Sequence, residues 1–402
     1  MTRQVDVLVI GAGPAGLAAA SRLAADGTRV EVLEREQQAG GVPRHCAHGG
    51  FGTWLRPLTG PAYARLLAGA AVRTGAVVRT GVTALDWAGP LVLTTVGPAG
   101  PETIEARAVV LATGARERPR AARLVPGTRP AGVYTTGELQ QAVHLYRQRI
   151  GTRAVVVGAE DVSYAAADTV RAAGAEVVAL VTELPCAQTA PARALDARLR
   201  RRVPLLTDTT VTELLGHGRL SGVRVRHRDG RAATLRCDTV VFTGDFMPDH
   251  ELARRGGLTL DSGTRGPAVD GALRTSHPGV FAVGSMLHAV ESAATATREG
   301  AHAAAAVREW LAQARWPVGV PLLVDPPLRW IAPNRVTPAV RRPYVLRTAT
   351  PLRSPVLYVT QDGSRLHRQP LLSAVPNRTL TLSARWTPRV DPEGGPVRVT
   401  VG

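Results

Sequence analysis

Near its N-terminus the chain reads Val5-Asp6-Val7-Leu8-Val9-Ile10-Gly11-Ala12-Gly13-Pro14-Ala15-Gly16-Leu17. The β-branched apolar run fits a buried parallel strand, and the G-x-G-x-x-G that follows opens an alanine-rich helical segment. In this dinucleotide-binding fingerprint Gly11 permits the tight turn, Gly13 lets the backbone approach a pyrophosphate, and Gly16 lets the helix pack against the strand. The unpaired N–H groups at the helix N-terminus then face the pyrophosphate. The stretch therefore predicts a Rossmann-like nucleotide-binding domain.

A carboxylate follows at the place that this fingerprint requires. Glu34 ends the second expected strand, residues 29–34. Its carboxylate can accept hydrogen bonds from both hydroxyls of a ribose, and it would repel a 2′-phosphate. The first nucleotide site therefore disfavours NADP.

The composition is that of a globular protein with an unusual choice of cation. The 402 residues are too many for one core and indicate two or three domains. The formal net charge is +17, but every cation is an arginine, spread along the chain, and no lysine occurs. Together with abundant alanine, glycine and proline, this pattern favours a GC-biased genome over nucleic-acid binding, so no nucleic-acid partner is expected. A docking face for an acidic partner subunit stays open as an alternative.

The cysteines argue against two kinds of redox centre. Cys46, Cys186 and Cys237 are isolated, with no C-x-x-C or C-x4-C pair. This spacing argues against a redox disulfide, and three thiolates are too few for the usual four ligands of an iron–sulfur cluster. A reduced, cytoplasmic protein is expected. The sequence also shows no signal peptide and no apolar stretch long enough to span a bilayer.

An unusual loop follows the ribose-binding acid. After the pair Gly40-Gly41 comes Val42-Pro43-Arg44-His45-Cys46-Ala47-His48-Gly49-Gly50-Phe51-Gly52. Paired glycines let the backbone turn beneath a long cofactor, so the loop is expected near the cofactor's far end. It could supply an anion clamp and a proton shuttle, and its catalytic candidates are Arg44, His45, Cys46 and His48.

Structural alternatives for this loop stay open. Cys46 could be a small packed residue, and the histidines could only hydrogen-bond a ring or a carbonyl group. No carboxylate accompanies the histidines, so no metal site is predicted.

Two later motifs complete a recognisable set. An apolar strand, residues 108–111, ends in the turn Ala112-Thr113-Gly114, and much later the chain reads Thr275-Ser276-His277-Pro278-Gly279-Val280-Phe281-Ala282-Val283-Gly284. In order with the fingerprint, Glu34 and Gly40-Gly41, these motifs resemble the two-dinucleotide-domain flavoproteins related to pyridine nucleotide-disulfide oxidoreductases, over residues 1–315. The resemblance implies that the first domain binds FAD, through Gly11, Gly13, Pro14, Ala15, Gly16, Glu34, Arg35, Gly41, Ala112, Thr113, Gly114, Gly284 and Ser285.

The loop at residues 40–52 narrows the resemblance. It is similar to the FAD subunits of hydroxyproline, opine and other amino-acid dehydrogenases and of hydrogen cyanide synthase, and to the flavoprotein partner of glycerol-3-phosphate dehydrogenases. In that partner a Gly-Gly pair precedes a Cys-x-His-x-x-Phe-Gly pattern, which this chain matches at Cys46, His48, Phe51 and Gly52. Such proteins act in multi-subunit dehydrogenases, so the resemblance implies a partner dehydrogenase or electron-transfer subunit.

The second nucleotide site departs from the family pattern. The expected strand and first glycine, residues 154–158, are followed by Ala159-Glu160-Asp161-Val162-Ser163. Glu160 and Ser163 replace the second and third glycines, and a side chain at the close-approach position blocks a pyrophosphate. We therefore expect a Rossmann-like domain whose NAD(P) binding is lost or greatly weakened. Glu183, near the place of a ribose-binding acid, is the one feature that favours residual binding.

The end of the FAD domain carries two further expectations. Ser285 stands where the late flavin motif commonly has an Asp, and its hydroxyl can still hydrogen-bond a ribityl hydroxyl. The family points the N-terminus of the next helix, expected from about Ser292 to Leu311, at the flavin, where its dipole favours the anionic reduced ring. His288 and Glu291 then either face the flavin edge, or Glu291 caps the helix and His288 is a loop histidine.

After Trp316-Pro317 the character of the sequence changes. Prolines become frequent, helical periodicity disappears, and Gln361-Asp362-Gly363-Ser364 is a hairpin-turn signal. Short strands are expected at residues 344–348, 356–360, 379–386 and 397–401. Such a domain would serve as a scaffold, in dimerisation or in subunit docking.

Together these observations predict an α/β protein with two Rossmann-like dinucleotide-binding domains and a small C-terminal all-β domain. The FAD-binding domain takes residues 1–118 and 244–315, and it is interrupted by an NAD-type domain with a degenerate fingerprint, residues 119–243. The C-terminal β domain takes residues 316–402.

The expected function is that of an FAD-dependent oxidoreductase. It would be a dehydrogenase or dehydrogenase subunit that acts on an amino acid, imino acid or small hydroxy compound and passes electrons to a partner or quinone. The alternatives are a stand-alone NAD(P)H-dependent flavin oxidoreductase and a noncatalytic flavin-bearing scaffold subunit, and a homo-oligomer stays open.

Overall fold

The computed structural model describes residues 2–53, 55–289, 291–337 and 342–402. They form two compact units, each built from separate parts of the sequence. Unit 1 comprises Met1–Arg44, Phe51–Arg116 and Met247–Gly402, and unit 2 comprises His45–Gly50 and Glu117–Phe246. The chain passes between the units at the short strands β9 (Ala115–Glu117) and β18 (Phe246–Pro248). His45–Gly50 belongs to unit 2 rather than to the first domain, and residues 316–402, expected as a separate β domain, belong to unit 1.

The main sheet of unit 1 is of the Rossmann type. Its parallel strands lie in the order β5 (Val77–Thr80), β2 (Val30–Glu34), β1 (Thr2–Ile10), β8 (Gly100–Leu111) and β19 (Val280–Ala282). The long strand β8 has two neighbours beyond β1, because its residues 109–111 pair with β19 and its residues 100–105 pair with antiparallel β7 (Val92–Gly97). β6 (Thr83–Gly89) extends the sheet beyond β7. The apolar end of β1 is buried throughout, as a central parallel strand requires.

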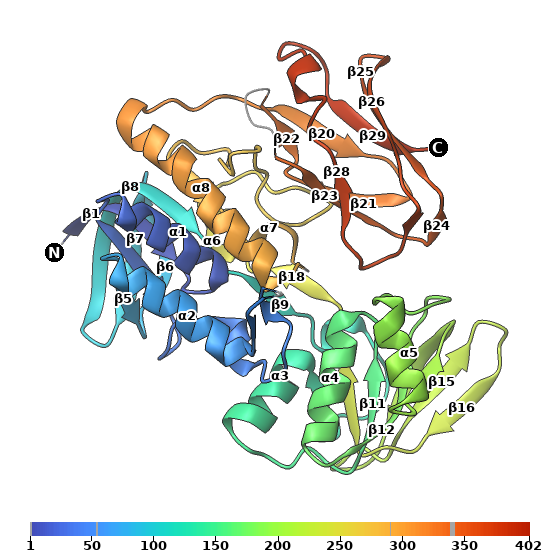
Figure 1. Ribbon diagram of the computed structural model, residues 1–402. Coiled ribbons are helices and arrows are strands. Elements are labelled where there is room, and N and C mark those ends of the chain that lie inside the picture. The colour runs from blue at the N-terminus through green and yellow to red at the C-terminus, as the bar shows by residue number, and fades with distance from the viewer. Residues whose placement is uncertain (1, 54, 290, 338–341) are drawn as a thin grey trace. The chain divides into compact units, whose positions relative to one another are not determined.

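Three helices of unit 1 pack around the fingerprint. α1 (Pro14–Ala25) begins directly after Gly13, which is its N-cap. It contacts both α2 (Gly60–Arg73) and α8 (Ala293–Gln313), and Figure 1 shows it between them. A Cβ on Gly300 of α8 would overlap the carbonyl oxygen of Ala15, so the two helix backbones touch there. The shorter helices of this unit are α6 (Glu251–Arg255) and α7 (Ser285–His288).

Unit 2 contains a second parallel sheet. Its strand order is β10 (Val133–Thr135), β17 (Thr239–Phe242), β11 (Arg153–Val157), β12 (Glu176–Val181) and β13 (Leu205–Leu206). The helices are α3 (Thr136–Gln140), α4 (Asp161–Ala172), which connects β11 to β12, and α5 (Pro191–Leu199). An antiparallel sheet of β14 (Thr209–Leu215), β15 (Gly222–His227) and β16 (Ala232–Leu235) completes the unit. The Rossmann-like α/β class predicted from the sequence is therefore confirmed for both parallel sheets.

The C-terminal strands of unit 1 enclose a core of their own. A five-stranded sheet has the order β22 (Arg335–Val336), β20 (Val320–Val324), β29 (Val397–Val401), β25 (Val356–Gln361) and β26 (Ser364–Pro370). A three-stranded sheet consists of β21 (Leu328–Ala332), β23 (Tyr344–Thr348) and β28 (Leu380–Leu382). Tyr344 stacks on Trp386 inside this core, with ring centroids 5.3 Å apart.

Two short ribbons remain. β3 (Phe51–Gly52) pairs with β4 (Pro57–Leu58), and β24 (Leu352–Arg353) pairs with β27 (Ser373–Ala374). None of the helices among the described residues combines the length and the apolar character that a bilayer crossing needs.

Candidate functional site

The structure brings three separate glycine motifs of unit 1 to the end of β1. Gly11 has a φ of +105°, and a Cβ on it would overlap the carbonyl oxygen of Ala112, so the Ala112-Thr113-Gly114 turn lies against the fingerprint. A Cβ on Gly41 would lie 2.9 Å from Cα of Gly13, and one on Gly284 would lie 2.7 Å from Cβ of Ala15. Residues far apart in the sequence therefore surround one loop.

The buried acid Glu34 holds this loop from its outer side. The Oε2 atom of Glu34 accepts a hydrogen bond from the backbone N–H of Ala12 at 2.9 Å, and Oε1 accepts one from Glu36 N–H at 2.9 Å. A carboxylate oxygen has two acceptor positions, so both oxygens can still accept from a ribose hydroxyl. Glu34 can thus fix the loop and bind a ribose with the same carboxylate.

Two observations show that the fingerprint loop, residues 11–16, has room for the pyrophosphate of FAD. No protein atom lies within 4 Å of the place that a Cβ on Gly13 would take, so the backbone there is open to close approach. Gly13 is also the N-cap of α1, and the first helical residue is Pro14, which has no N–H to leave unpaired. With Gly16 packed against Gly11, the N-terminal turn of α1 presents its backbone N–H groups at this opening.

Two other candidates for cofactor contacts have protein partners, and a third lies at the start of a helix. The Arg35 guanidinium lies 3.5 Å from the carboxylate of Asp249, and the Thr113 hydroxyl donates a hydrogen bond to the carbonyl oxygen of Asp249 at 2.7 Å. Ser285 begins α7 directly after Gly284. All of them belong to unit 1, on the elements that surround the fingerprint loop.

The four catalytic candidates are divided between the units. Arg44 belongs to unit 1, where its guanidinium donates to the carbonyl oxygen of Gln38 at 3.0 Å and to Gln38 Oε1 at 3.3 Å. His45, Cys46 and His48 belong to unit 2, and Nδ1 of His48 lies 2.7 Å from the carbonyl oxygen of Gly49.

Cys46 lies in a buried polar corner of unit 2. Its thiol is within 3.4 Å of Oε1 of Gln140, and burial, with the nearby carboxyl of Glu117, raises the pKa of Cys46 to about 12. Burial also raises the pKa of Glu117, although its carboxyl accepts a hydrogen bond from Gly137 N–H at 2.6 Å. Cys46 is therefore a neutral thiol at physiological pH, which favours the packed-residue alternative over a nucleophile.

The second nucleotide loop is filled by its own side chains. The carboxylate of Glu160 accepts hydrogen bonds from Ala159 N–H at 3.0 Å and from the Thr243 hydroxyl at 2.7 Å. The Ser163 hydroxyl accepts from Glu160 N–H at 3.2 Å and lies 2.7 Å from the Thr243 hydroxyl. A Cβ on Gly158 would lie 2.6 Å from the Ser163 hydroxyl and 2.8 Å from Glu160 Oε1.

These contacts place a carboxylate at the N-terminus of α4, where a pyrophosphate would have to bind. Glu160 is only 5% exposed, and it is the N-cap of the helix. The residues present therefore do not fit the pyrophosphate of NAD(P). Glu183, the feature that favours residual binding, is exposed just beyond the end of β12.

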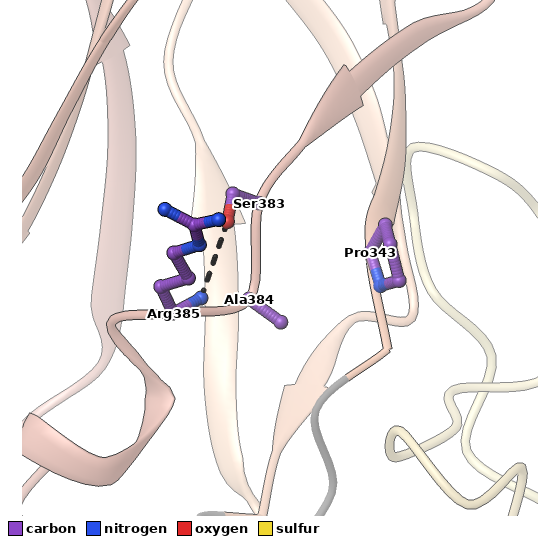
Figure 2. Close-up of a pocket in the computed structure, with 4 residues that line it drawn as sticks. All are labelled: Pro343, Ser383, Ala384 and Arg385. Carbon is purple, nitrogen blue, oxygen red and sulfur yellow. Dashed lines mark hydrogen bonds between the residues drawn. The ribbon is translucent and has the colours of Figure 1, made fainter.

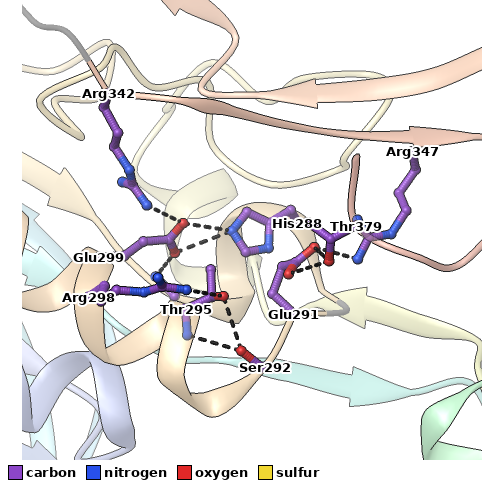
Figure 3. Close-up of polar contacts among 10 residues, drawn as sticks. His288, Glu291, Ser292, Thr295, Arg298, Glu299, Arg342, Arg347 and Thr379 are labelled. Atoms are coloured by element: carbon purple, nitrogen blue, oxygen red, sulfur yellow. Dashed lines mark hydrogen bonds and ion pairs between the residues drawn. The ribbon is translucent and has the colours of Figure 1, made fainter. Parts of the chain in front are cut away.

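At the start of α8, Glu291 takes neither of the two roles expected from the sequence, which were to face the flavin edge or to cap the helix. Ser292 caps the helix by accepting from Thr295 N–H at 3.2 Å, whereas the Glu291 carboxylate pairs with Arg347 and accepts from the Thr379 hydroxyl at 3.0 Å (Figure 3). Since the Glu291 side chain is 3% exposed, this is a buried ion pair with the C-terminal strands. Glu291 therefore neither caps the helix nor is available at its tip.

His288 ends α7 and takes part in a second buried cluster. Its Nε2 atom lies 3.0 Å from Oε1 of Glu299, and its ring stacks on Trp330 with centroids 5.9 Å apart. Glu299 and Arg342, whose guanidinium donates to Glu299 at 2.7 Å, were not singled out from the sequence. One signal was present, because Glu299 is a lone carboxylate within the buried stripe of small residues on α8 that includes Ala296, Gly300 and Ala303.

A separate hollow lies on the C-terminal β strands. It has a volume of about 240 Å³ and is lined by Pro343, Ser383, Ala384 and Arg385 (Figure 2). The Ser383 hydroxyl accepts from Arg385 N–H at 3.3 Å. These lining residues include no carboxylate, histidine or thiol, so they offer no acid–base group.

Comparison with known proteins identifies the family of this chain. Residues 5–300 match the family described as pyridine nucleotide-disulphide oxidoreductase. Sarcosine oxidase subunit alpha from Corynebacterium sp. (strain P-1) is 31% identical over 357 residues, which cover 82% of this chain and 35% of that protein. Thioredoxin reductase from Mycolicibacterium smegmatis is 30% identical over 314 residues, which cover 77% of this chain and 97% of that protein.

A solved structure shows the same fold. The crystal structure of T. acidophilum thioredoxin reductase has a TM-score of 0.65 at 25% identity, covering 76% of this chain and 98% of that chain. This chain spans 35% of the length of two of the sarcosine oxidase subunits that it matches. The resemblance inferred from the glycine motifs is confirmed, and the chain belongs to the pyridine nucleotide-disulphide oxidoreductase family, whose members are FAD-binding oxidoreductases.

Proposed function

We propose that this chain is the FAD-binding part of a dehydrogenase that oxidises an amino acid, imino acid or small hydroxy compound and passes the electrons to a partner subunit or a quinone. The observation that carries the proposal is the contrast between the two nucleotide loops. The loop at Gly13 is open to a pyrophosphate, whereas the loop at Gly158 is filled by Glu160. In this proposal the loop at Gly158 leaves no room for the pyrophosphate of NAD(P)H.

The cysteines support the same choice against thiol–disulfide exchange. None of Cys46, Cys186 and Cys237 is in a disulfide, and no two of them are close in sequence. Without a dithiol in unit 2, the chemistry named for the thioredoxin reductase relatives has no centre here. The relative named as subunit alpha of a sarcosine oxidase supports the proposal that this chain is one subunit of a larger enzyme.

The chain's own residues would bind the cofactor and orient the substrate. Glu34 would hold the ribose and the N-terminus of α1 the pyrophosphate. FAD, when bound, supplies an acceptor for a hydride from the substrate carbon. The Arg44 guanidinium, fixed by Gln38, would attract the carboxylate of an anionic substrate, and His45 or His48 would take a proton. Cys46 would pack as a neutral thiol.

The visible spectrum of the purified protein tests this proposal. We expect a yellow protein that releases FAD on denaturation and whose flavin absorbance persists when NADH or NADPH is added without oxygen. A protein that cannot be reconstituted with FAD would contradict the cofactor assignment and favour a noncatalytic scaffold.

Titration calorimetry with NADH tests the second loop directly. We expect no binding to the unmodified chain, and binding at least tenfold tighter in the variant Glu160→Gly/Ser163→Gly, because the variant frees the N-terminus of α4. Glu213→Gln, which removes an exposed carboxylate of unit 2, is the matched control and should not bind. Micromolar affinity of the unmodified chain for NADH would overturn the proposal.

One observation favours a second candidate, a stand-alone NAD(P)H-dependent flavin oxidoreductase. The alignment covers 97% of the thioredoxin reductase from Mycolicibacterium smegmatis, so a complete relative of that kind fits within this chain. Rapid bleaching of the flavin by NADH or NADPH alone would support this candidate.

A further inference from the structure

The buried carboxylate of Glu299 joins three segments of unit 1. Its Oε2 atom accepts a hydrogen bond from the backbone N–H of Gly284 at 3.1 Å. Its Oε1 atom lies 3.0 Å from Nε2 of His288 and accepts from Arg342 at 2.7 Å (Figure 3). The Glu299 side chain is 3% exposed, so these contacts replace the water that an ion of this kind would otherwise hold.

Gly284 connects this carboxylate to the fingerprint loop. It ends the Val280–Gly284 motif, has a φ of +76°, and lies so close to Ala15 that a Cβ on it would be 2.7 Å from that of Ala15. The next residue along α8, Gly300, touches the Ala15 backbone from the other direction. Glu299 therefore determines where the amide of Gly284 points, beside the first turn of α1.

The ionised state of Glu299 depends on a residue from the C-terminal part of the chain. Burial alone would raise its pKa, but the hydrogen bonds and charges of His288 and Arg342 hold the pKa of Glu299 below its ordinary value. Arg342 precedes β23 and comes from outside the Rossmann sheet. The guanidinium of the neighbouring Arg298 donates a hydrogen bond to the Thr295 hydroxyl at 3.3 Å. The carboxylate of Glu299 is paired with Arg342.

A second buried ion pair lies eight residues earlier in the chain. Glu291, just before α8, pairs with Arg347 on β23, and the Arg347 guanidinium lies 5.2 Å from the ring centroid of Trp330. Glu291, just before α8, and Glu299, within it, are thus each paired with an arginine in or near β23. Without these arginines, each buried carboxylate would lose a counter-charge that offsets the cost of its desolvation.

We infer that Glu299 is a positioning residue of the FAD site and that Arg342 makes the C-terminal β strands part of that site. Glu299 acts through the Gly284 amide, and Arg342 keeps Glu299 charged and in place. The inference rests on the proposed FAD site and adds to it a requirement for the C-terminal strands. Their role is then to control how firmly the cofactor is held.

FAD affinity measured as a function of pH tests this inference. The apoprotein is titrated with FAD between pH 5.5 and 9, following flavin fluorescence, for the unmodified chain and Arg342→Met. We expect pH-independent binding by the unmodified chain. In Arg342→Met, where His288 is the one cationic side chain of the described residues still bonded to the carboxylate, we expect binding at least tenfold weaker at high pH and recovering at low pH, because protonation of Glu299 then removes its uncompensated charge.

Three further variants separate charge from packing. Arg342→Lys keeps the charge and should retain pH-independent binding. Glu299→Gln/Arg342→Met removes both the carboxylate and the guanidinium of this cluster, so it should fold and should bind FAD without pH dependence. Arg398→Met breaks an exposed ion pair with Asp325 and should behave like the unmodified chain.

The outcomes distinguish this inference from the proposed function. An unmodified chain that takes up no FAD would overturn both. If the unmodified chain binds FAD, then Arg342→Met with unchanged affinity, or with a pH-independent loss that Glu299→Gln does not relieve, overturns the role of Glu299 and Arg342 alone. If Arg342→Met does not fold, a pH-dependent FAD affinity in Glu299→Gln/Arg342→Met overturns the inference in its place.

Discussion

Two buried glutamates act in opposite ways on the two nucleotide loops. Glu34 accepts from Ala12 N–H and so holds the first loop from its outer side, which leaves the backbone at Gly13 accessible. Glu160 stands inside the second loop and accepts from Ala159 N–H and Thr243. The same functional group therefore preserves one anion site and occupies the other, because Glu34 follows the fingerprint whereas Glu160 replaces the second glycine of its own.

Replacing Gly13 by valine should abolish FAD binding while the protein remains folded. A Cβ at Gly13 meets no protein atom within 4 Å, and the N-cap residue has a φ of −79°, which valine can adopt. The side chain would instead occupy the place of the pyrophosphate. We expect the flavin content after reconstitution to fall by more than about tenfold, with an unchanged far-UV circular dichroism spectrum.

Gly89→Val is the matched control for this variant. A Cβ on Gly89 would make only an ordinary contact of 3.8 Å with Val92, on strands far along the sheet from the fingerprint. It should bind FAD normally. Full flavin content in Gly13→Val would contradict the assignment of the cofactor loop.

At the scale of elements, the contact between α1 and α8 depends on a single glycine. Alanine at an ordinary helix position is more favourable than glycine by about 1 kcal/mol. At Gly300 a Cβ would overlap the carbonyl oxygen of Ala15, a backbone atom that cannot turn aside. Gly300→Ala should therefore lower the free energy of unfolding by about 1–3 kcal/mol, measured by urea titration of tryptophan fluorescence.

Gly69→Ala on α2 is the control with the opposite expected sign. A Cβ there would meet only the end of the Arg73 side chain, at 2.9 Å, and that flexible group can move. We expect this variant to be stabilised by up to about 1 kcal/mol. A Gly300→Ala protein as stable as the unmodified chain would show that the two helices can separate without cost.

Short sequence patterns predicted most of the strands in the C-terminal part of the chain. The strands expected at residues 344–348 and 397–401 are β23 and β29 with the same bounds, and the strand expected at 356–360 is β25, one residue longer. The stretch 379–386 forms a strand only over Leu380–Leu382, because Trp386 turns into the C-terminal core. β26 has one apolar residue, Leu366, among the polar residues 365–369, so it shows no alternation of apolar residues and was not expected from the sequence.

In the candidate site, too, the sequence revealed local motifs but not the contacts between distant residues. The glycine motifs and the replacement of the glycines in the second loop are short local patterns, so they could be recognised in the sequence, whereas the contacts that bring the glycine motifs together join residues far apart. The partners of Glu291 and Glu299 lie tens of residues away, on strands whose pairing no local pattern specifies. Arg342 and Arg347 are also two among many arginines, so nothing in the sequence distinguished them.

At the scale of the whole molecule, the two units have separate cores. The apolar clusters around β1 and around Trp386 belong to unit 1, and those around β11 belong to unit 2. All six tryptophans of the sequence fall within the ranges of unit 1. Tryptophan fluorescence therefore reports on unit 1, whereas far-UV circular dichroism reports on both units.

We expect unfolding of the apoprotein in guanidinium chloride to give different midpoints by these two probes. Each unit has its own sheet and core, which is the condition for separate cooperative transitions. The comparison should be made without FAD, because a ligand held by one unit would stabilise that unit alone. Coincident transitions by both probes would show that the units unfold as one.

The position of β8 in the first sheet affects how the protein folds during synthesis. Its neighbour β19 and the helix that covers α1 are translated only after all of unit 2. At about 5–20 residues per second, roughly ten to forty seconds separate the end of β8 from the end of α8 on the ribosome. During that interval the nascent first sheet exposes an unpaired edge and an uncovered helix, so this chain should depend on chaperones until its last third emerges.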